Sequence, residues 1–329
     1  MARELIIIDV DHVWSETTEQ RGARSGLAGV RENLLIDATI CQDAILYKRN
    51  VSIAWIDIPK AYDTVSHELI LLVLQHLKEH PGVSAVVREL IARCRTSVAV
   101  GGHRTGERIQ LISYKRRIFQ GNSLSPPLFC LVHLPLSLSL RGGWRYMAGK
   151  PNNRKHKVTH LLYIDDLKIY AKNQHDLQKM LNVNTGTHSQ YDNTEHRRSV
   201  MEGESVSLLN GSTIQRLQLN NSYTYLGIKQ REMHDITTVK ATLTERYKKT
   251  LRTIWMSQLT AKHKSTATNM LAVPIVSHTF ASIRWNVDEI KQLDRDTRKT
   301  LTMCRSPNAS VQRLYLPRRE GDRELINIE

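Results

Sequence analysis

Cysteine is scarce in this sequence of 329 residues, which contains only Cys41, Cys94, Cys130 and Cys304. The four stand far apart, and no Cys-x-x-Cys pair is present. This spacing argues against a structural zinc site and against a disulfide framework. It fits a reducing compartment, so we expect the protein to be intracellular, in the nucleus or cytoplasm, and not secreted.

Long hydrophobic runs are lacking as well. The apolar run before Asp9 is too short for a secretory signal. The longest uncharged run, residues 118–140, contains Gln120, Asn122 and three prolines. We therefore expect a loop followed by a buried helix there, and no membrane as a partner.

Acidic side chains are outnumbered, with 32 Asp and Glu against 47 Lys and Arg and a formal net charge of +15. The chain is 40% hydrophobic and 24% charged, which is typical of a globular protein rather than a disordered one. A globular chain this basic usually meets a polyanion, and nucleic acid is the default partner. A merely soluble cationic protein is the plainer alternative.

Positive charge is concentrated in two stretches. Residues 104–157 hold eleven Lys and Arg against the single acidic residue Glu107, and seven Lys and Arg with no acidic residue stand between Glu245 and Asp288. The second stretch has a helical apolar pattern, which predicts a basic helical subdomain able to hold a duplex. Basic side chains are often simply solvated, but as contacts to a nucleic-acid backbone we single out Arg24, Arg31, Lys248, Lys249 and Arg252.

The chemistry of the chain centres on Asp165 and Asp166, which stand between two apolar runs in the segment HLLYIDDLKIY, residues 160–170. Such runs predict two buried strands joined by a tight turn. Ionised carboxylates at a buried tip need a partner, and Mg²⁺ is commonly held by one or two carboxylates. Taken alone, an Asp-Asp pair is as typical of a solvated turn.

A third carboxylate strengthens this interpretation. The segment VSIAWIDI, residues 51–58, predicts a strand that contains Asp57 near its end and is stopped by Pro59. Three carboxylates at the ends of adjacent strands would form a two-metal site, which activates an attacking 3′-hydroxyl and stabilises a leaving pyrophosphate.

Four segments occur in an order that resembles the successive motifs of a reverse transcriptase. They are AWIDIPKAYD at residues 54–63, FQGNSLSP at 119–126, YIDD at 163–166 and YLGI at 225–228. The nearest group is the non-LTR (LINE-type) retrotransposon family, in particular the lineage with a restriction-like endonuclease. The resemblance implies an α+β fold, a right-hand polymerase with an antiparallel-sheet palm, partial fingers and a helical thumb.

The resemblance also implies a division into domains. Residues 1–50 would be partial fingers, residues 51–228 the palm with interleaved fingers elements and the primer-grip hairpin, and residues 229–329 the helical thumb and connector. Apolar spacing predicts helices near residues 34–45, 66–79, 84–95 and 128–140 and from residue 240 onward. Residues 182–205 lose this periodicity, which indicates either an eroded structural element or a long loop.

The activity implied is RNA-directed DNA polymerisation, in which a DNA 3′ end is extended on an RNA template with dNTPs. Two Mg²⁺ ions, or Mn²⁺, would be held by Asp57, Asp165 and Asp166. The resemblance assigns nucleotide binding to Ile58, Tyr62, Gln120 and Gly121, and primer binding to Tyr225, Leu226 and Gly227. Tyr62 would stack beneath the incoming sugar and exclude a 2′-hydroxyl, although a core aromatic is its plainer interpretation.

The sequence departs from the family pattern at several positions. Glycine is usual where Arg117 stands, aspartate where Asn122 stands, and a lysine where His196 aligns. We expect a fragment or eroded copy of a longer element protein, with partner chains possible as the source of missing fingers or an endonuclease. A catalytically inactive polymerase-fold remnant that binds RNA or DNA is the alternative function, and an RNA-copying RNA polymerase is the third.

Overall fold

The computed structural model describes residues 18–24, 26–57, 60–77, 80–97, 111–114, 116–118, 121, 123–142, 145–150, 156–188, 198–201, 206–207, 213–216, 223–230, 236–280, 282–304, 315 and 325–326. The chain divides into two compact units. Residues 1–29 with 40–218 form the sheet unit, and residues 30–39 with 219–329 form the helical unit.

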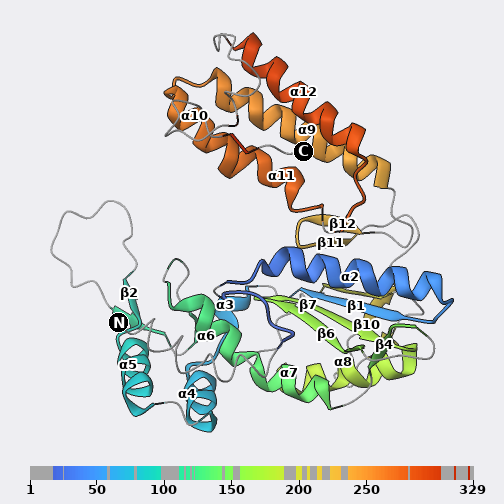
Figure 1. Ribbon diagram of the computed structural model, residues 1–329. Helices are drawn as coiled ribbons and strands as arrows, with labels where there is room; N and C mark the ends of the chain where they lie inside the picture. The colour runs from blue at the N-terminus through green and yellow to red at the C-terminus, as the bar shows by residue number, and fades with distance from the viewer. Residues whose placement is uncertain are drawn as a thin grey trace, which may run out of the picture. The chain divides into compact units, whose positions relative to one another are not determined.

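A six-stranded sheet organises the sheet unit (Figure 1), in the order β6-β7-β1-β8-β10-β9. Its strands are β1 (Ser52–Asp57), β6 (His160–Tyr163), β7 (Asp166–Ala171), β8 (Arg198–Met201), β9 (Val206–Ser207) and β10 (Thr213–Arg216). All neighbours pair antiparallel except β8 and β10, which pair in parallel. The strands β1, β6 and β7 coincide with the apolar runs, whose β-branched and aromatic residues favour a pleated and buried surface.

Two helices cover one face of this sheet, α7 (Leu134–Arg141) and α8 (Gln174–His188). Alternate residues of a strand point to the same face, so every second residue of β1 and β7 meets these helices. The core formed there consists of Ala54, Ile56, Leu136, Leu140, Leu162, Leu167, Ile169, Ala171, Leu177, Met180 and Leu181.

A second core lies among α3 (Ala61–Thr64), α4 (His67–His76), α5 (Pro81–Ala92) and α6 (Ser125–Val132). Pro81 occupies the first turn of α5, where its fixed φ suits a helix start and its missing N–H costs nothing. Two short antiparallel pairs complete this unit, β2 (Arg95–Ser97) with β3 (Leu111–Ser113) and β4 (Tyr146–Ala148) with β5 (His156–Val158).

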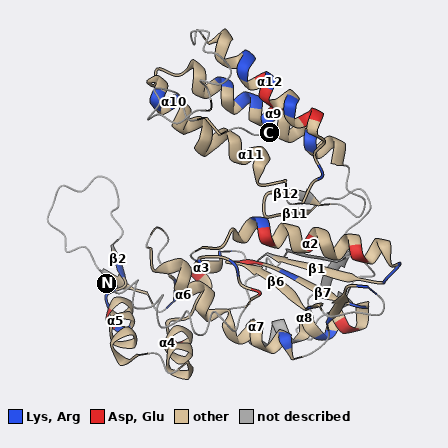
Figure 2. Ribbon diagram, viewed as in Figure 1, with Lys and Arg blue, Asp and Glu red and all other residues tan. Residues whose placement is uncertain are grey.

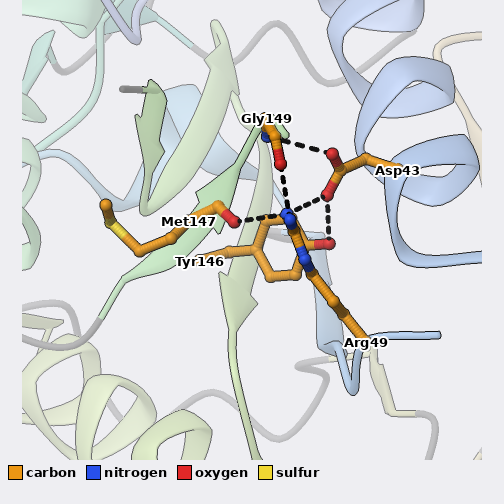
Figure 3. Close-up of polar contacts among 5 residues, drawn as sticks. All are labelled: Asp43, Arg49, Tyr146, Met147 and Gly149. Atoms are coloured by element: carbon orange, nitrogen blue, oxygen red, sulfur yellow. Dashed lines mark hydrogen bonds and ion pairs between the residues drawn. The ribbon is translucent and has the colours of Figure 1, made fainter. Parts of the chain in front are cut away.

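The last turns of α2 (Gly29–Leu46) are fastened to β4 by a buried polar cluster (Figure 3). Asp43 accepts hydrogen bonds from the Tyr146 hydroxyl at 2.7 Å and from the Gly149 N–H at 2.9 Å. Arg49 pairs with the same carboxylate at 2.8 Å and donates to the carbonyls of Met147 and Gly149. These partners hold the pKa of Asp43 below its usual value against the opposing effect of burial. The cluster is therefore a satisfied structural anchor.

The helical unit contains the antiparallel pair β11 (Tyr223–Tyr225) and β12 (Ile228–Gln230), followed by α9 (Ile236–Met256), α10 (Ala261–Ala267), the π-helix η1 (Thr268–Ala272), α11 (Val273–Ser277) and α12 (Val287–Met303). Residues 30–39 of α2 also belong to it. Its core contains Tyr247, Leu251, Ile254, Trp255, Val276, Leu293 and Leu301.

Several boundaries differ from the sequence-based expectations. A long loop was one of two alternatives for residues 182–205, and it is wrong in part, because α8 continues to His188 and β8 begins at Arg198, where it pairs with β1. The helix expected over 128–140 is two helices that meet at His133, next to Pro135. Residues 223–230 form a hairpin, with Tyr225 paired opposite Ile228. Within the part of the chain that the structure describes, no helix is both long enough and apolar enough to cross a membrane.

The domain division proposed from sequence stays a prediction. The compact units separate near residue 218, so the β11–β12 hairpin groups with the helices that follow it.

Candidate active site

The aspartate hairpin, residues 160–171, consists of β6, a turn at Ile164–Asp165, and β7. Tyr163 pairs with Asp166 across the end of the hairpin. The flanking strand residues are buried, whereas Asp165 and Asp166 are half-buried. The apolar runs therefore present two adjacent carboxylates at the tip of an otherwise buried element.

Asp57 reaches the same end of the sheet through its strand. The β1–β7 pairing runs from Ser52 opposite Ala171 to Ile56 opposite Leu167, where it ends. Paired antiparallel residues have Cα atoms about 4.5–5.5 Å apart. Asp57 and Asp166 are the next residues beyond the last pair, so two of the three predicted ligands lie at the same end of the sheet.

The donor set suits a hard cation, because carboxylate oxygens are the ligands that Mg²⁺ prefers in proteins. The side chain of Asp57 lies outside the described part of the chain, and the strand register places its backbone. Among the side chains that the structure does describe, no group of three His, Cys, Asp or Glu residues is placed to hold a metal ion.

Tyr62 lies on α3, with its ring stacked on Phe129 at a centroid distance of 4.8 Å and an interplanar angle of 23°. Partial burial raises the pKa of Tyr62 to about 12, and the neighbouring Cys130 thiol and Asp165 carboxylate add to the rise. The hydroxyl is therefore protonated at neutral pH. Tyr62 packs against a core and also lies within electrostatic reach of Asp165, and its role toward the incoming sugar stays a prediction.

The segment that leads to Gly121 is hydrogen-bonded to the chain around Tyr62. The Ile118 N–H donates to the Tyr62 carbonyl at 2.8 Å, and the Arg117 N–H donates to the Val65 carbonyl at 2.9 Å. Gly121 itself is exposed, with φ +89° and open space around it. The other predicted nucleotide contacts in this region, Ile58 and Gln120, lie outside the described residues, as do the departures Asn122 and His196.

Arg117 is one of the departures from the family pattern, and the structure shows how the chain accommodates it. Its φ is +103°, a conformation that glycine adopts freely and that strains other residues. Its guanidinium lies 3.0 Å from the Asp63 carboxylate and over the Tyr114 ring. The backbone at this position thus keeps a conformation that favours glycine, although the residue is an arginine.

The predicted primer-binding residues form the turn of the β11–β12 hairpin. Leu226 and Gly227 have φ values of +48° and +82°, the signature of a type I′ turn. Tyr225 is buried, Leu226 is half-buried and Gly227 is exposed. The strand after the turn is anchored by Gln230, whose amide donates to the buried Asp37 carboxylate at 2.6 Å.

The five basic residues selected from sequence differ in their hydrogen bonds, ion pairs and exposure. Lys248 is ion-paired with Asp296 at 2.7 Å, and Arg31 and Arg24 donate long hydrogen bonds of 3.4 Å to Ser277 and to the Gln20 carbonyl. Lys249 and Arg252 have exposed side chains on α9, where basic residues recur along the helix (Figure 2). Within this set, Lys249 and Arg252 are the ones best placed for a polyanion.

Sequence reasoning missed two residues behind the carboxylates. Lys168 is 1% exposed, and its ammonium lies 4.7 Å from the Trp55 ring centroid and 5.6 Å from that of Tyr170. Because it is two residues after Asp166, it shares that residue's face of the strand. The sequence did contain a signal for this buried residue, because Lys168 stands inside an apolar run. The second residue, Gln20, is 3% exposed and contacts the Ile164–Asp165 turn.

A buried histidine supports the base of the aspartate hairpin. His160 is hydrogen-bonded at 2.8 Å to the hydroxyls of both Ser137 and Thr159. Burial lowers the pKa of His160 to about 4, with Glu19 opposing the shift and Arg141 adding to it. This imidazole is neutral at pH 7 and structural.

Residues 17–192 match the reverse transcriptase (RNA-dependent DNA polymerase) family, and this span contains Asp57, Tyr62 and the aspartate hairpin. The chain belongs to the reverse transcriptase family. As a class, reverse transcriptases use divalent metal ions, in line with the carboxylate donors found here.

The chain is similar to two curated proteins of Popillia japonica, each a retrovirus-related Pol polyprotein from type-1 retrotransposable element R2. One is 29% identical over 160 residues, which are 47% of this chain and 21% of the relative. The other is 28% identical over 133 residues, 40% of this chain and 21% of the relative. The predicted resemblance to a non-LTR retrotransposon reverse transcriptase is confirmed, and the chain spans about a fifth of the length of these relatives.

Among solved structures, the chain resembles apo telomerase from Candida tropicalis with a TM-score of 0.50 at 11% identity. The match covers 92% of this chain and 55% of the telomerase chain. It confirms the predicted fold, a mixed α+β right-hand polymerase.

Proposed function

We propose that this chain is an RNA-directed DNA polymerase that extends a DNA 3′ end on an RNA template by two-metal nucleotidyl transfer. The observation that carries the proposal is the β1–β7–β6 register, which sets the end of the Asp57 strand beside the tip bearing Asp165 and Asp166. This arrangement lies inside the span that matches the reverse transcriptase family.

Each residue then has a defined task. Asp57, Asp165 and Asp166 would hold two Mg²⁺ ions, for which Mn²⁺ could substitute. Ions held there would supply Lewis-acid activation of the 3′-hydroxyl and charge neutralisation of the pyrophosphate. The protonated Tyr62 beside Asp165 would face the sugar of the incoming dNTP, so that a deoxyribose is preferred.

The remaining predicted contacts concern the substrates. Ile58, Gln120 and Gly121 would border the incoming nucleotide, and Tyr225 to Gly227 would hold the end of the DNA primer. The exposed cations of α9 would contact the backbone of the hybrid duplex, in a salt-dependent manner. We also propose an intracellular location, in keeping with four cysteines of which none forms a disulfide.

A primer-extension assay tests the proposal. Wild-type protein with an RNA template, a DNA primer, dNTPs and Mg²⁺ should extend the primer, and Asp165→Asn should abolish extension because it removes a negative ligand. Asp288→Asn, which alters an exposed carboxylate on α12, is the matched control and should extend as wild type does. Equal incorporation by wild type and Asp165→Asn would contradict the proposal.

A second candidate is a polymerase-fold remnant that binds RNA or DNA without turnover. Arg117 favours it, because this strained non-glycine residue directly precedes Ile118, whose N–H donates to the Tyr62 carbonyl. In that case salt-dependent binding of a hybrid duplex would persist while extension stays undetectable even with Mn²⁺. Extension by the wild type would exclude this candidate.

A further inference from the structure

The turn that carries Asp165 is contacted by a segment far away in sequence, residues 19–22. Gln20 pairs with Leu162 as a parallel bridge alongside β6. The Arg21 N–H donates to the Leu162 carbonyl at 3.1 Å, and the Leu162 N–H donates to the Glu19 carbonyl at 3.0 Å. The segment thus extends the sheet by one short backbone pairing beside the aspartate hairpin.

Gln20 reaches from this segment into the turn itself. Its Oε1 accepts hydrogen bonds from the Ile164 N–H at 3.1 Å and from the Gly22 N–H at 2.8 Å, and its Nε2 lies 3.5 Å from the Ile164 carbonyl. With the side chain 3% exposed, water has little access to replace these bonds. Both polar groups of the Ile164 backbone are therefore within hydrogen-bonding distance of one side chain.

The backbone held in this way is strained. Ile164 has φ +56°, a region that β-branched residues rarely occupy. A β-carbon on Gly22 would lie 2.6 Å from Ile164 Cγ1 and 2.7 Å from Ile164 N, so the two chains touch closely. Strain of this kind persists only where the surroundings over-determine the conformation.

We propose that Gln20 is a positioning residue for the aspartate hairpin. Its carboxamide fixes the strained backbone of Ile164 and so sets the direction in which the next residue, Asp165, presents its carboxylate to divalent ions. The metal-binding part of this inference rests on the proposed function, whereas the backbone part stands on the contacts alone.

Two measurements on the full chain separate these parts. Hydrogen–deuterium exchange of the Ile164 amide reports the backbone, and titration with Mn²⁺ followed by electron paramagnetic resonance reports the ligands. Only the Mn²⁺ binding that Asp165→Asn removes is counted. Gln20→Met keeps the side-chain length but removes the acceptor, and Gln20→Glu keeps an acceptor at the same place. Gln292→Met, at an exposed glutamine of α12, is the matched control.

Gln20→Met should speed exchange of the Ile164 amide roughly fivefold to tenfold, as expected for the loss of one net hydrogen bond. It should weaken Mn²⁺ binding by about tenfold or more, the usual effect of removing a group that orients a ligand. Gln20→Glu should exchange slowly at Ile164, and Gln292→Met should match the wild type in both measurements.

Unchanged exchange in Gln20→Met overturns the inference. Faster exchange with unchanged Mn²⁺ affinity overturns its metal-binding part. If exchange is faster but the wild type shows no Mn²⁺ binding sensitive to Asp165→Asn, the positioning role of Gln20 stands and the proposed function fails. Should circular dichroism show Gln20→Met to be unfolded, Gln20→Asn, which ends one carbon short, replaces it with the same expected directions.

Discussion

The Ile164–Asp165 turn and the Leu226–Gly227 turn are both short hairpin connections with positive φ values, but their surroundings are opposite. The first has a β-branched residue at φ +56°, held by a buried glutamine and touched by Gly22. The second has a glycine at φ +82° with nothing within 4 Å of where its β-carbon would stand. The first turn is held by contacts from a distant segment, whereas the second, with Leu226 at φ +48° before Gly227, has open space at its glycine.

The comparison teaches where precision is needed. Ligands for a pair of metal ions must be held in a narrow range of positions, which a turn supported from outside can provide. A turn that projects into open space is able to adapt to what it meets. We expect the aspartate hairpin to be the rigid partner and the β11–β12 turn the adaptable one.

The largest expected difference between the two regions appears in acid. Burial lowers the pKa of both His133 and His160 to about 4, and both belong to the sheet unit. In the unfolded state both histidines bind a proton near pH 6.5, whereas in the folded state they stay neutral down to about pH 4. The free energy of unfolding is therefore highest above pH 6.5 and falls as the pH drops toward 4. Each histidine should lower the free energy of unfolding by roughly 2 kcal/mol at pH 5 relative to pH 7.

Hydrogen exchange at pH 5 and pH 7, corrected for the intrinsic rates, measures this difference. Peptides from the aspartate hairpin should lose protection at pH 5 while α9 peptides lose much less. The residues 223–230 of the second hairpin contain no histidine. His160→Gln should reduce the pH dependence of the sheet unit, and an unchanged dependence in that variant would show that His160 is not its source.

Paired glycine substitutions probe the two turns directly. Gly22→Ala forces a clash with the Ile164 backbone and should lower the free energy of unfolding by about 3 kcal/mol. Gly227→Ala meets no neighbour and should cost only about 1 kcal/mol for its positive φ. Urea denaturation of both variants measures the difference, and equal losses would remove the contrast drawn between the turns.

The smallest expected effect concerns Arg117, a third site of positive φ. Arg117→Gly relieves a conformation at φ +103° but gives up a half-exposed ion pair with Asp63. Such surface pairs contribute little, so the variant should be more stable by about 1 kcal/mol. Arg116→Gly, at an exposed residue paired as a bridge with Ser66 and with no positive φ, should instead be neutral or destabilised. A stabilised Arg116→Gly and a destabilised Arg117→Gly would contradict this account.

Much of the site follows from local sequence. The strands around Asp57 and the aspartate pair were predictable because short continuous apolar runs favour buried strands. The turn between Tyr163 and Asp166 followed from the polar interruption of that run. Helix α9 followed from its apolar stripe, and the fold family from the order of four short motifs.

Other parts had no local signal. The stretch 182–205 is polar and aperiodic, yet part of it continues α8 and part of it pairs with β1, since a neighbouring strand can recruit a segment of low intrinsic preference. The contact between Gln20 and Ile164 joins residues 144 positions apart. Nothing in the residues next to Gln20 indicates that its amide will close a turn.

By itself the sequence determined which segments become the central strands, which residue types are available as metal ligands, and the excess of positive charge. Those properties depend on hydrophobic patterning and side-chain chemistry, which neighbouring residues set. Only the tertiary structure decided that the pairing of β1 with β7 brings Asp57 and Asp166 to the same end of the sheet, that the Lys168 ammonium lies near the Trp55 and Tyr170 rings, and that Gln20 supports the turn before Asp165. Registers and buried hydrogen bonds depend on which distant groups come into contact, and that choice is made when the whole core packs.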